Sequence, residues 1–160
     1  MSAFSRRPSV TQQTHKEWNV KYQMLALLTA FAWGVGGYFE KRGMHLGGIS
    51  PQLGAAMRTA VAFLILGTLS YSQWSTLTTA GPRAILYIVV GGGILAGAIG
   101  MLAFYTAIHG APLSKVMPIA FTSPLFGAMM GLAFGGESFS WALVLGTTLT
   151  ISGIFVLTAS

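Results

Sequence analysis

The sequence predicts an all-α membrane protein built as a bundle of five transmembrane helices. Apolar residues make up 53% of the 160 residues and charged residues only 8%, which is far from the composition of a soluble domain. Glycine is abundant, at 21 residues, and it is more frequent in membrane helices than in soluble ones. Several apolar runs approach the roughly 20 residues that a helix needs to cross a bilayer. The alternating pattern of a barrel strand does not occur in the sequence.

The chain opens with a polar segment and a first span. Residues 1–21 are rich in Ser, Thr and Gln and carry four basic residues against one acid, so they are predicted to form a disordered N-terminal tail. The membrane domain, residues 22–158, begins with a span at about residues 22–39. Trp33 lies deep in this span and is therefore a candidate for lining a substrate cavity, whereas aromatic residues at helix ends usually mark the interface.

The second span is predicted at about residues 51–72. Pro51 suits the first position of a helix, and Ser50 suits the capping position before it. The preceding glycine-rich stretch, residues 43–50, is predicted to be a loop. His45 lies in this stretch and no second histidine stands at ligand spacing, so His45 is predicted to be solvated and no metal site is predicted.

Arg58 is the charge that the sequence places well inside a span, about two turns from the start of the second helix. A charge inside a membrane helix is costly, which makes Arg58 the best single candidate for a substrate-binding residue. Three roles stay open for it. The side chain can snorkel to the interface, clamp loop carbonyls or the end of a neighbouring helix, or present its planar fork to a substrate carboxylate or phosphate.

The third span is predicted at about residues 84–108, after a polar turn that Gly81-Pro82 ends. Gly93 and Gly97 form a small-xxx-small pair, which suits close packing against another membrane helix. Tyr105, near the end of this span, is a further candidate substrate contact.

The fourth span, at about residues 115–135, contains two prolines. Pro118 and Pro124 each remove a backbone hydrogen bond, which is tolerated in lipid where protein, water or hydroxyl groups cover the freed carbonyl. Thr122 supplies a nearby hydroxyl and is a candidate substrate contact, and Gly127 and Gly131 suit close contact with a neighbouring helix. The sequence leaves open whether this is a kinked packing helix or a substrate-lining helix.

The fifth span, at about residues 141–158, follows a tight link in which Ser140 is a predicted helix cap. Glu137 lies in that link. The preferred interpretation is that its charge favours the positive end of the following helix, and the alternative is a role in proton transfer.

Short motifs follow one another in a fixed order along residues 22–158. They are Ala32-Trp33-Gly34, Ile49-Ser50-Pro51, Met57-Arg58, Tyr105-Thr106-Ala107, Ser123-Pro124-Leu125-Phe126, Gly136-Glu137 and Trp141. The ordered set resembles one EamA-like repeat, the five-helix unit of the drug/metabolite transporter superfamily. Most members carry two such repeats in one chain, and this sequence carries one.

The resemblance implies a half-size membrane transporter that works as an antiparallel homodimer. Small multidrug transporters, distant relatives by the same resemblance, use a mid-membrane glutamate in the first helix to export cationic drugs. Here that helix has no acid before Glu40 at its edge, so the expected substrate is a small neutral or anionic metabolite. The alternative function is a non-transporting accessory subunit of a larger membrane protein complex, since a fold does not imply a function.

Catalysis and nucleic-acid binding are not expected. Three acids, three histidines and no cysteine, spread over different loops, provide no catalytic constellation, so the sequence predicts neither an enzyme nor a cofactor. The net charge of +6 arises from basic residues at span ends, where lipid headgroups and topology account for it. The expected partners are the lipid bilayer, a small-molecule substrate, and a second copy or a larger membrane complex.

The distribution of positive charge predicts the orientation. The N-terminal side of the predicted bundle carries Arg6, Arg7, Lys16, Lys21 and Arg83, and the opposite side carries Lys41, Arg42 and Lys115. The excess favours a cytoplasmic N-terminus in a multi-pass protein of the prokaryotic plasma (inner) membrane, with the C-terminus outside.

Overall fold

The computed structural model describes residues 20–135 and 138–159 of the chain. The predicted tail up to residue 19, and Glu137 with its predicted electrostatic role, lie outside these residues. The described part is helical and contains no strand. Its elements are α2 (Val20–Gly47), α3 (Pro51–Leu69), the 3₁₀ turn η1 (Tyr71–Gln73), α4 (Thr76–Thr79), α5 (Pro82–Tyr87), the π-helical η2 (Ile88–Gly100), α6 (Met101–Gly110), α7 (Leu113–Ala120), α8 (Ser123–Phe134) and α9 (Trp141–Ala159).

Four helical stretches in the described residues are long and apolar enough to cross a membrane, and this confirms the predicted all-α membrane protein. They are Pro51–Leu69, Pro82–Gly110, Leu113–Phe134 and Trp141–Thr158. The 28-residue α2 is not among them. Its apolar run includes Gln23, Trp33 and Tyr38 and ends in the charged Glu40, all of which lower its hydropathy. A fifth crossing, by α2, therefore stays a prediction.

The chain divides into two compact units, which are described separately. One consists of residues 36–116 and is called the hairpin unit. The other, called the groove unit, comprises the described residues of Met1–Val35 and Met117–Ser160. Helices α2 and α7 each contribute residues to both units.

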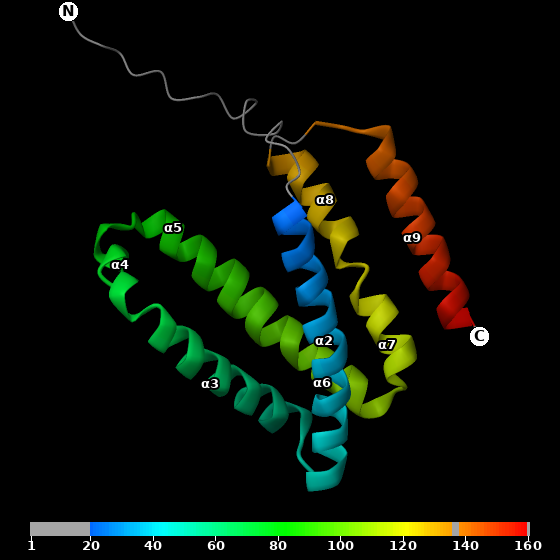
Figure 1. Cartoon of the computed structure of the whole chain (residues 1–160), viewed down its shortest axis with the longest axis horizontal. Helices are drawn as coiled ribbons and strands as arrows, with labels where there is room; N and C mark the ends of the chain where they lie inside the picture. The colour runs from blue at the N-terminus through cyan, green and yellow to red at the C-terminus, as the bar shows by residue number, and fades with distance from the viewer. Residues whose placement is uncertain (1–19, 136–137, 160) are drawn as a thin grey trace, which may run out of the picture. The chain divides into compact units, whose positions relative to one another are not determined.

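In the hairpin unit, α3 and the continuous α5–η2–α6 rod form the two arms of a hairpin with α4 at its turn (Figure 1). Helix α3 begins at Pro51, and the Ser50 hydroxyl accepts a hydrogen bond from the Leu53 amide at 3.3 Å, which satisfies one of the free donors at the helix start. Pro82 similarly occupies the first turn of α5, after Gly81.

The structure corrects the predicted loop at residues 43–50, because α2 continues to Gly47. Gly48 then adopts a left-handed conformation with φ +58°, and the Ile49 amide donates to the Met44 carbonyl at 2.9 Å. This is the Schellman arrangement, in which glycine takes the left-handed position and the next residue packs back on the helix. His45 therefore lies on the last turn of α2 rather than in a loop, and it is exposed.

The middle of the α5–η2–α6 rod is a π-helix rather than an α-helix over Ile88–Gly100. A Cβ atom added at Gly97 would lie 2.9 Å from the Gly92 carbonyl oxygen, and one at Gly100 would lie 3.3 Å from that of Leu95. Both oxygens belong to the residue five positions earlier, which is the hydrogen-bond spacing of a π-helix. The glycines in this stretch allow the wider backbone, because they carry no side chain that would resist it.

In the groove unit, the predicted single fourth helix is broken into α7 and α8. Pro118 lies inside α7, whereas Pro124 lies in the first turn of α8, a position where a proline costs no hydrogen bond. The chain between the two helices turns at Phe121 and Thr122. The two prolines thus play different roles, and Pro124 starts a new helix instead of kinking a continuous one.

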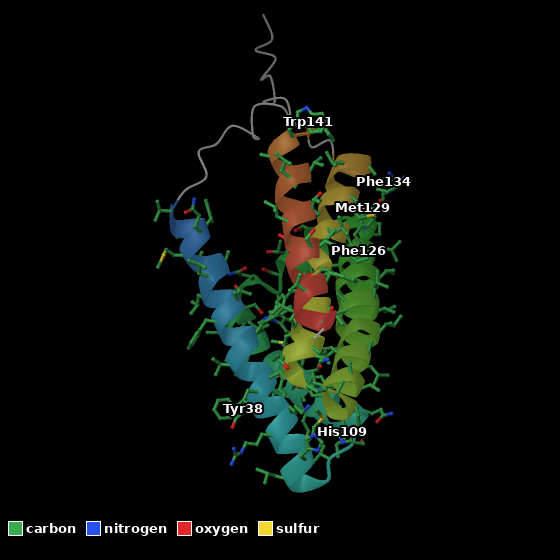
Figure 2. All side chains as sticks on the ribbon, turned by 90° about the vertical axis from the view of Figure 1, so that its right-hand side faces the viewer. Tyr38, His109, Phe126, Met129, Phe134 and Trp141 are labelled. Carbon is green, nitrogen blue, oxygen red and sulfur yellow. The ribbon has the colours of Figure 1, made fainter. Side chains whose placement is uncertain are left out.

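The buried core is small and lies in the hairpin unit. Among the described residues, the buried hydrophobic side chains are Met44, Ala55, Tyr105 and Ile108. They come from the end of α2, the start of α3 and the end of α6, with residues from the start of α7 packed beside them. Elsewhere large apolar side chains are exposed. Phe126, Met129 and Phe134 follow one another along α8 (Figure 2) at 62%, 57% and 81% exposure.

Candidate functional site

An ion pair joins α2 to α3 in the hairpin unit. The Arg58 Nε lies 3.0 Å from the Glu40 Oε1, and the two side chains are 35% and 20% exposed. Their positions mirror each other: Glu40 precedes the end of α2 at Gly47 by as many residues as Arg58 follows the start of α3 at Pro51. Because a short turn joins the two helices, both charges lie at about the same distance from that turn along the helix axes.

Helix α6 completes the surroundings of the ion pair. Nη1 of Arg58 contacts the Met101 Sδ, a weak acceptor, and the Tyr105 side chain interacts with Glu40. Tyr105 is 2% exposed. Within the described part of the chain, the remaining nitrogen of the guanidinium makes no hydrogen bond or ion pair. The ion pair therefore lies against one buried phenol and one thioether, and Arg58 keeps unused donors.

Helices α2 and α6 also contact each other near their C-terminal ends, past the residues that surround the ion pair. Met44 and Ile108 belong to the same buried core, and the rings of His45 and His109 stack at 5.0 Å between centroids with 17° between their planes. Lys41 Nζ donates to the carbonyl of Ala111, the capping residue that follows the last residue of α6. This Lys41 contact places a cation at a helix C-terminus, where the backbone dipole favours it.

Gly54 allows Tyr105 to reach the cluster. A Cβ atom at Gly54 would lie 3.0 Å from the Tyr105 Cε1 and 3.2 Å from the Met44 Cγ. Since both of those side chains are buried, neither can move aside easily. The missing side chain on α3 therefore lets α6 and α2 approach it closely.

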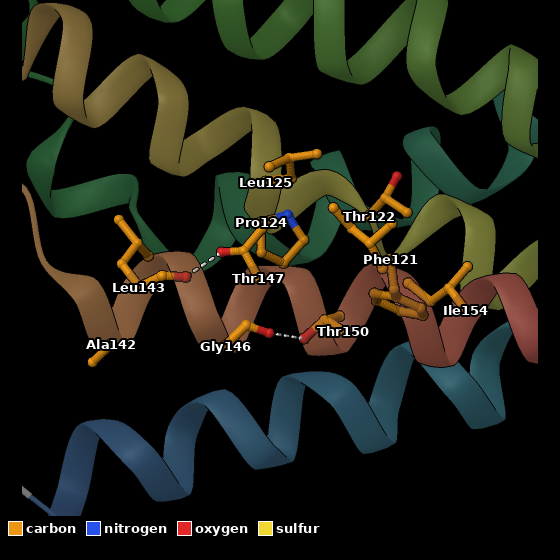
Figure 3. A pocket seen from close by; sticks show the side chains of 11 residues that line it. Phe121, Thr122, Pro124, Leu125, Ala142, Leu143, Gly146, Thr147, Thr150 and Ile154 are labelled. Carbon is orange, nitrogen blue, oxygen red and sulfur yellow. Dashed lines mark hydrogen bonds between the residues drawn. The ribbon is translucent and has the colours of Figure 1, made fainter.

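The groove unit has a second candidate site at the break between α7 and α8. A groove of about 270 Å³ is lined by residues of the break and of α9 (Figure 3). Most of its lining is apolar, and its three hydroxyl groups belong to Thr122, Thr147 and Thr150. Thr147 and Thr150 donate to the Leu143 and Gly146 carbonyls at 2.7 and 2.8 Å. Thr122 likewise donates to the Ile119 carbonyl at 2.8 Å. All three hydroxyl oxygens keep lone pairs with which they can accept a hydrogen bond from a ligand.

The four residues predicted to contact substrate fall into the two units. Arg58 and Tyr105 are brought together around Glu40 in the hairpin unit. Trp33 and Thr122 belong to the groove unit. The Trp33 ring is 53% exposed and lies 6.2 Å from the Phe121 ring at the helix break.

The residues predicted to pack against neighbouring helices have different surroundings. A Cβ atom at Gly93 or Gly127 would meet nothing within 4 Å, while Gly97 faces the backbone of its own helix. Gly131 is half-buried. A helix that packs closely against Gly93 or Gly127 would therefore have to belong to another molecule or to residues that are not described.

Sequence reasoning missed two partners. The predicted first span has Glu40 only at its edge, because nothing local in the sequence indicates that the helix extends to Gly47. The equal distances of Glu40 and Arg58 from the turn are the signal that could have paired them. His109 was similarly not matched with His45, since the two lie on different helices.

Comparison with known proteins gives the class to which this fold belongs. The model of the EamA-like transporter family matches residues 20–159, nearly the whole chain. No curated protein and no solved structure matches. The chain therefore belongs to the EamA-like transporter family, and it is consistent with a single EamA repeat in a multi-pass integral membrane protein.

Proposed function

We propose that this chain is a half-size transporter of a small neutral or anionic metabolite, and that two copies in opposite orientations form the pathway. Family membership supplies the transporter class. The observation that carries the proposal further is the break between α7 and α8, which lies beside a largely apolar groove with three threonines in its wall. Broken helices at membrane depth are tolerated where they are buried in protein or line a cavity.

The size and chemistry of the groove support the proposal that two copies of the chain form a transport pathway. Small-molecule sites usually have volumes of about 300–1,000 Å³, and the groove measures about 270 Å³. One copy would thus contribute part of a cavity that a second copy completes. Threonine oxygens at its wall suit hydroxyl or amide groups of a neutral solute, and the Arg58 guanidinium suits a carboxylate or phosphate.

A paired arrangement also accounts for the exposed apolar surface. Much of the surface of α8 and α9 is apolar and uncovered, and lipid or a second copy would cover it. Many transporters contain two halves in inverted orientation, related by an axis in the membrane plane. An antiparallel homodimer in the prokaryotic inner membrane, with the N-terminus cytoplasmic in the major orientation, would reproduce this arrangement without enzymatic activity or a cofactor.

A non-transporting accessory subunit is the second candidate. The internal pairing of Arg58 with Glu40 favours it, because the pairing accounts for the arginine without a substrate.

Solute uptake by proteoliposomes tests the proposal. Wild-type protein should take up members of a panel of labelled amino acids, sugars and organic acids faster than protein-free liposomes. Thr147→Val with Thr150→Val removes two groove hydroxyls and should slow uptake several-fold without loss of folded protein. Thr106→Val is the matched control, since Thr106 also bonds its own helix but lies outside the groove. Folded protein that moves no solute would support the accessory role instead.

A further inference from the structure

We infer that the Arg58–Glu40 pair is a proton-linked anion site: a carboxylate or phosphate binds Arg58 while Glu40 takes up one proton from water. The inference rests on the proposed function, whose substrate class it narrows to anions. It starts from the charges. Arg58 and Glu40 neutralise each other across 3.0 Å, and the other close groups, Tyr105 and Met101, are uncharged.

Arg58 can accept a second anion on geometric grounds. Guanidinium carries five N–H donors in a planar fork. Glu40 pairs with Nε of Arg58, and Met101 Sδ contacts its Nη1. Sulfur is a weak acceptor, so an oxyanion would displace it from Nη1. Arg58 is also 35% exposed, so a ligand can approach its free edge.

Charge balance then links anion binding to a proton. If an anion joined the pair while Glu40 stayed ionised, the cluster would hold one excess negative charge beside the buried Tyr105 ring. Uncompensated charge is costly in a poorly solvated site. Protonation of Glu40 removes the excess: one anion and one proton enter together, and the net charge of the cluster does not change.

Tyr105 is placed to stabilise the protonated state. Its hydroxyl both donates and accepts hydrogen bonds. It can donate to the Glu40 carboxylate in the resting state and accept from the Glu40 carboxylic acid in the anion-bound state. The change requires only rotation of a hydroxyl proton, so the buried ring itself need not move.

The remaining charged or titratable groups of the packed elements make other contacts or are exposed. On α2, Lys41 donates to the Ala111 carbonyl and Arg42 Nη1 donates to the Tyr38 hydroxyl at 2.9 Å. His45 stacks on His109 of α6, and Lys115 on α7 is exposed. Among the described residues, the ionisable groups recorded against Glu40 are therefore Arg58 and Tyr105.

Calorimetry on the full chain in mild detergent tests the inference, with acetate, benzoate and inorganic phosphate as probes. Titration in two buffers of different ionisation enthalpy should show uptake of close to one proton for each anion bound. Where Glu40 is ionised in the free protein and protonated in the complex, the dissociation constant should rise about tenfold for each unit of pH. Binding without proton uptake, or no binding of any probe, overturns the inference.

Three variants separate the roles. Arg58→Gln should abolish anion binding, and Glu40→Gln should retain binding but lose its proton uptake. Arg42→Gln is the matched control: it also replaces an arginine by glutamine, but on α2 and outside the ion pair, and it should behave as wild type. If Glu40→Gln does not fold, Tyr105→Phe replaces it: the ion pair remains, the acceptor for the Glu40 proton is lost, and anion affinity at a given pH should fall several-fold. Unchanged affinity in Tyr105→Phe would contradict the assigned role of Tyr105.

The binding and uptake experiments distinguish a failure of the anion site from a failure of the transport proposal. Anion binding with proton uptake but no uptake by proteoliposomes would leave the site intact and refute transport. Uptake of neutral solutes without anion binding would uphold transport and refute the site.

Discussion

Gly54 is the residue at which the smallest change should have the clearest effect on the hairpin unit. A side chain there would collide with Tyr105 and Met44, both of which are buried. Gly54→Leu should therefore lower the free energy of unfolding by about 1–3 kcal/mol, the usual cost of overpacking. Thermal unfolding in detergent measures this. Gly43→Leu is the control, because a Cβ at Gly43 meets nothing within 4 Å. Equal stability of the two variants would show that Tyr105 is not confined as described.

The ion pair should behave as a coupled unit. Removing one partner of a buried pair leaves an uncompensated charge and costs about 3–5 kcal/mol. Since Arg58 and Glu40 are 35% and 20% exposed, solvent reduces the expected loss for Arg58→Gln to about 1–3 kcal/mol. Combining it with Glu40→Gln should restore most of that loss. A double-mutant cycle by thermal unfolding checks this, and strictly additive losses would mean that the two charges do not interact.

Arg58→Lys distinguishes charge from geometry at the same position. Lysine retains the positive charge and loses the planar fork. The variant should therefore remain folded, because the pairing with Glu40 survives, yet bind carboxylates several-fold more weakly than wild type. Wild-type affinity in a folded Arg58→Lys protein would show that a point charge suffices.

At the scale of the elements, the break between α7 and α8 is the feature on which the proposed transport function depends most. Pro124 lies at the start of α8 and removes the amide that would otherwise continue the preceding helix. Pro124→Ala should allow α7 and α8 to join, and hydrogen exchange at Phe121 and Thr122 should then slow. Solute uptake should fall while stability changes little.

Pro118→Ala provides the comparison, since Pro118 lies inside α7 and away from the turn. It should leave the exchange at Phe121 and Thr122 unchanged. If both proline variants preserve wild-type uptake, the break plays no part in the pathway.

The sequence predicts those features of the elements that local chemistry determines. Ser50-Pro51 and Gly81-Pro82 mark the starts of α3 and α5, because caps and prolines act on adjacent backbone. The extension of α2 to Gly47 was not predicted, since the charged residues after position 39 suggest the end of a span although they are compatible with a helix. The π-helical η2 was not predicted either, because glycines permit a wider helix without requiring it.

The candidate site was predictable only in part. Arg58 and Tyr105 could be identified because polar groups inside apolar spans are costly and therefore conspicuous. Glu40 could not, because its partnership depends on the register of three helices rather than on its neighbours in sequence. The groove between the helix break and α9 likewise depends on tertiary packing, although Thr122 and Pro124 pointed to the segment that forms it.

At the scale of the whole molecule, orientation is the first property to test. Lys21 and Arg83 lie on the predicted cytoplasmic side together with the arginines and lysine of the tail, against Lys41, Arg42 and Lys115 on the other side. This modest excess should place the N-terminus inside in most copies. C-terminal reporter fusions should then report mainly from outside, with a smaller cytoplasmic signal from copies in the opposite orientation. A C-terminus found only in the cytoplasm would contradict this topology.

The proposed pairing of two copies is best tested by the mass of the assembly extracted from the membrane in mild detergent. A homodimer, two chains of 16.9 kDa each, is expected, because a second copy would complete the groove and cover the exposed apolar faces. Native mass spectrometry resolves the number and identity of the chains. A stoichiometric complex in which one copy of this chain is bound to a different membrane protein, with no homodimer, would contradict the account and identify the chain as an accessory subunit.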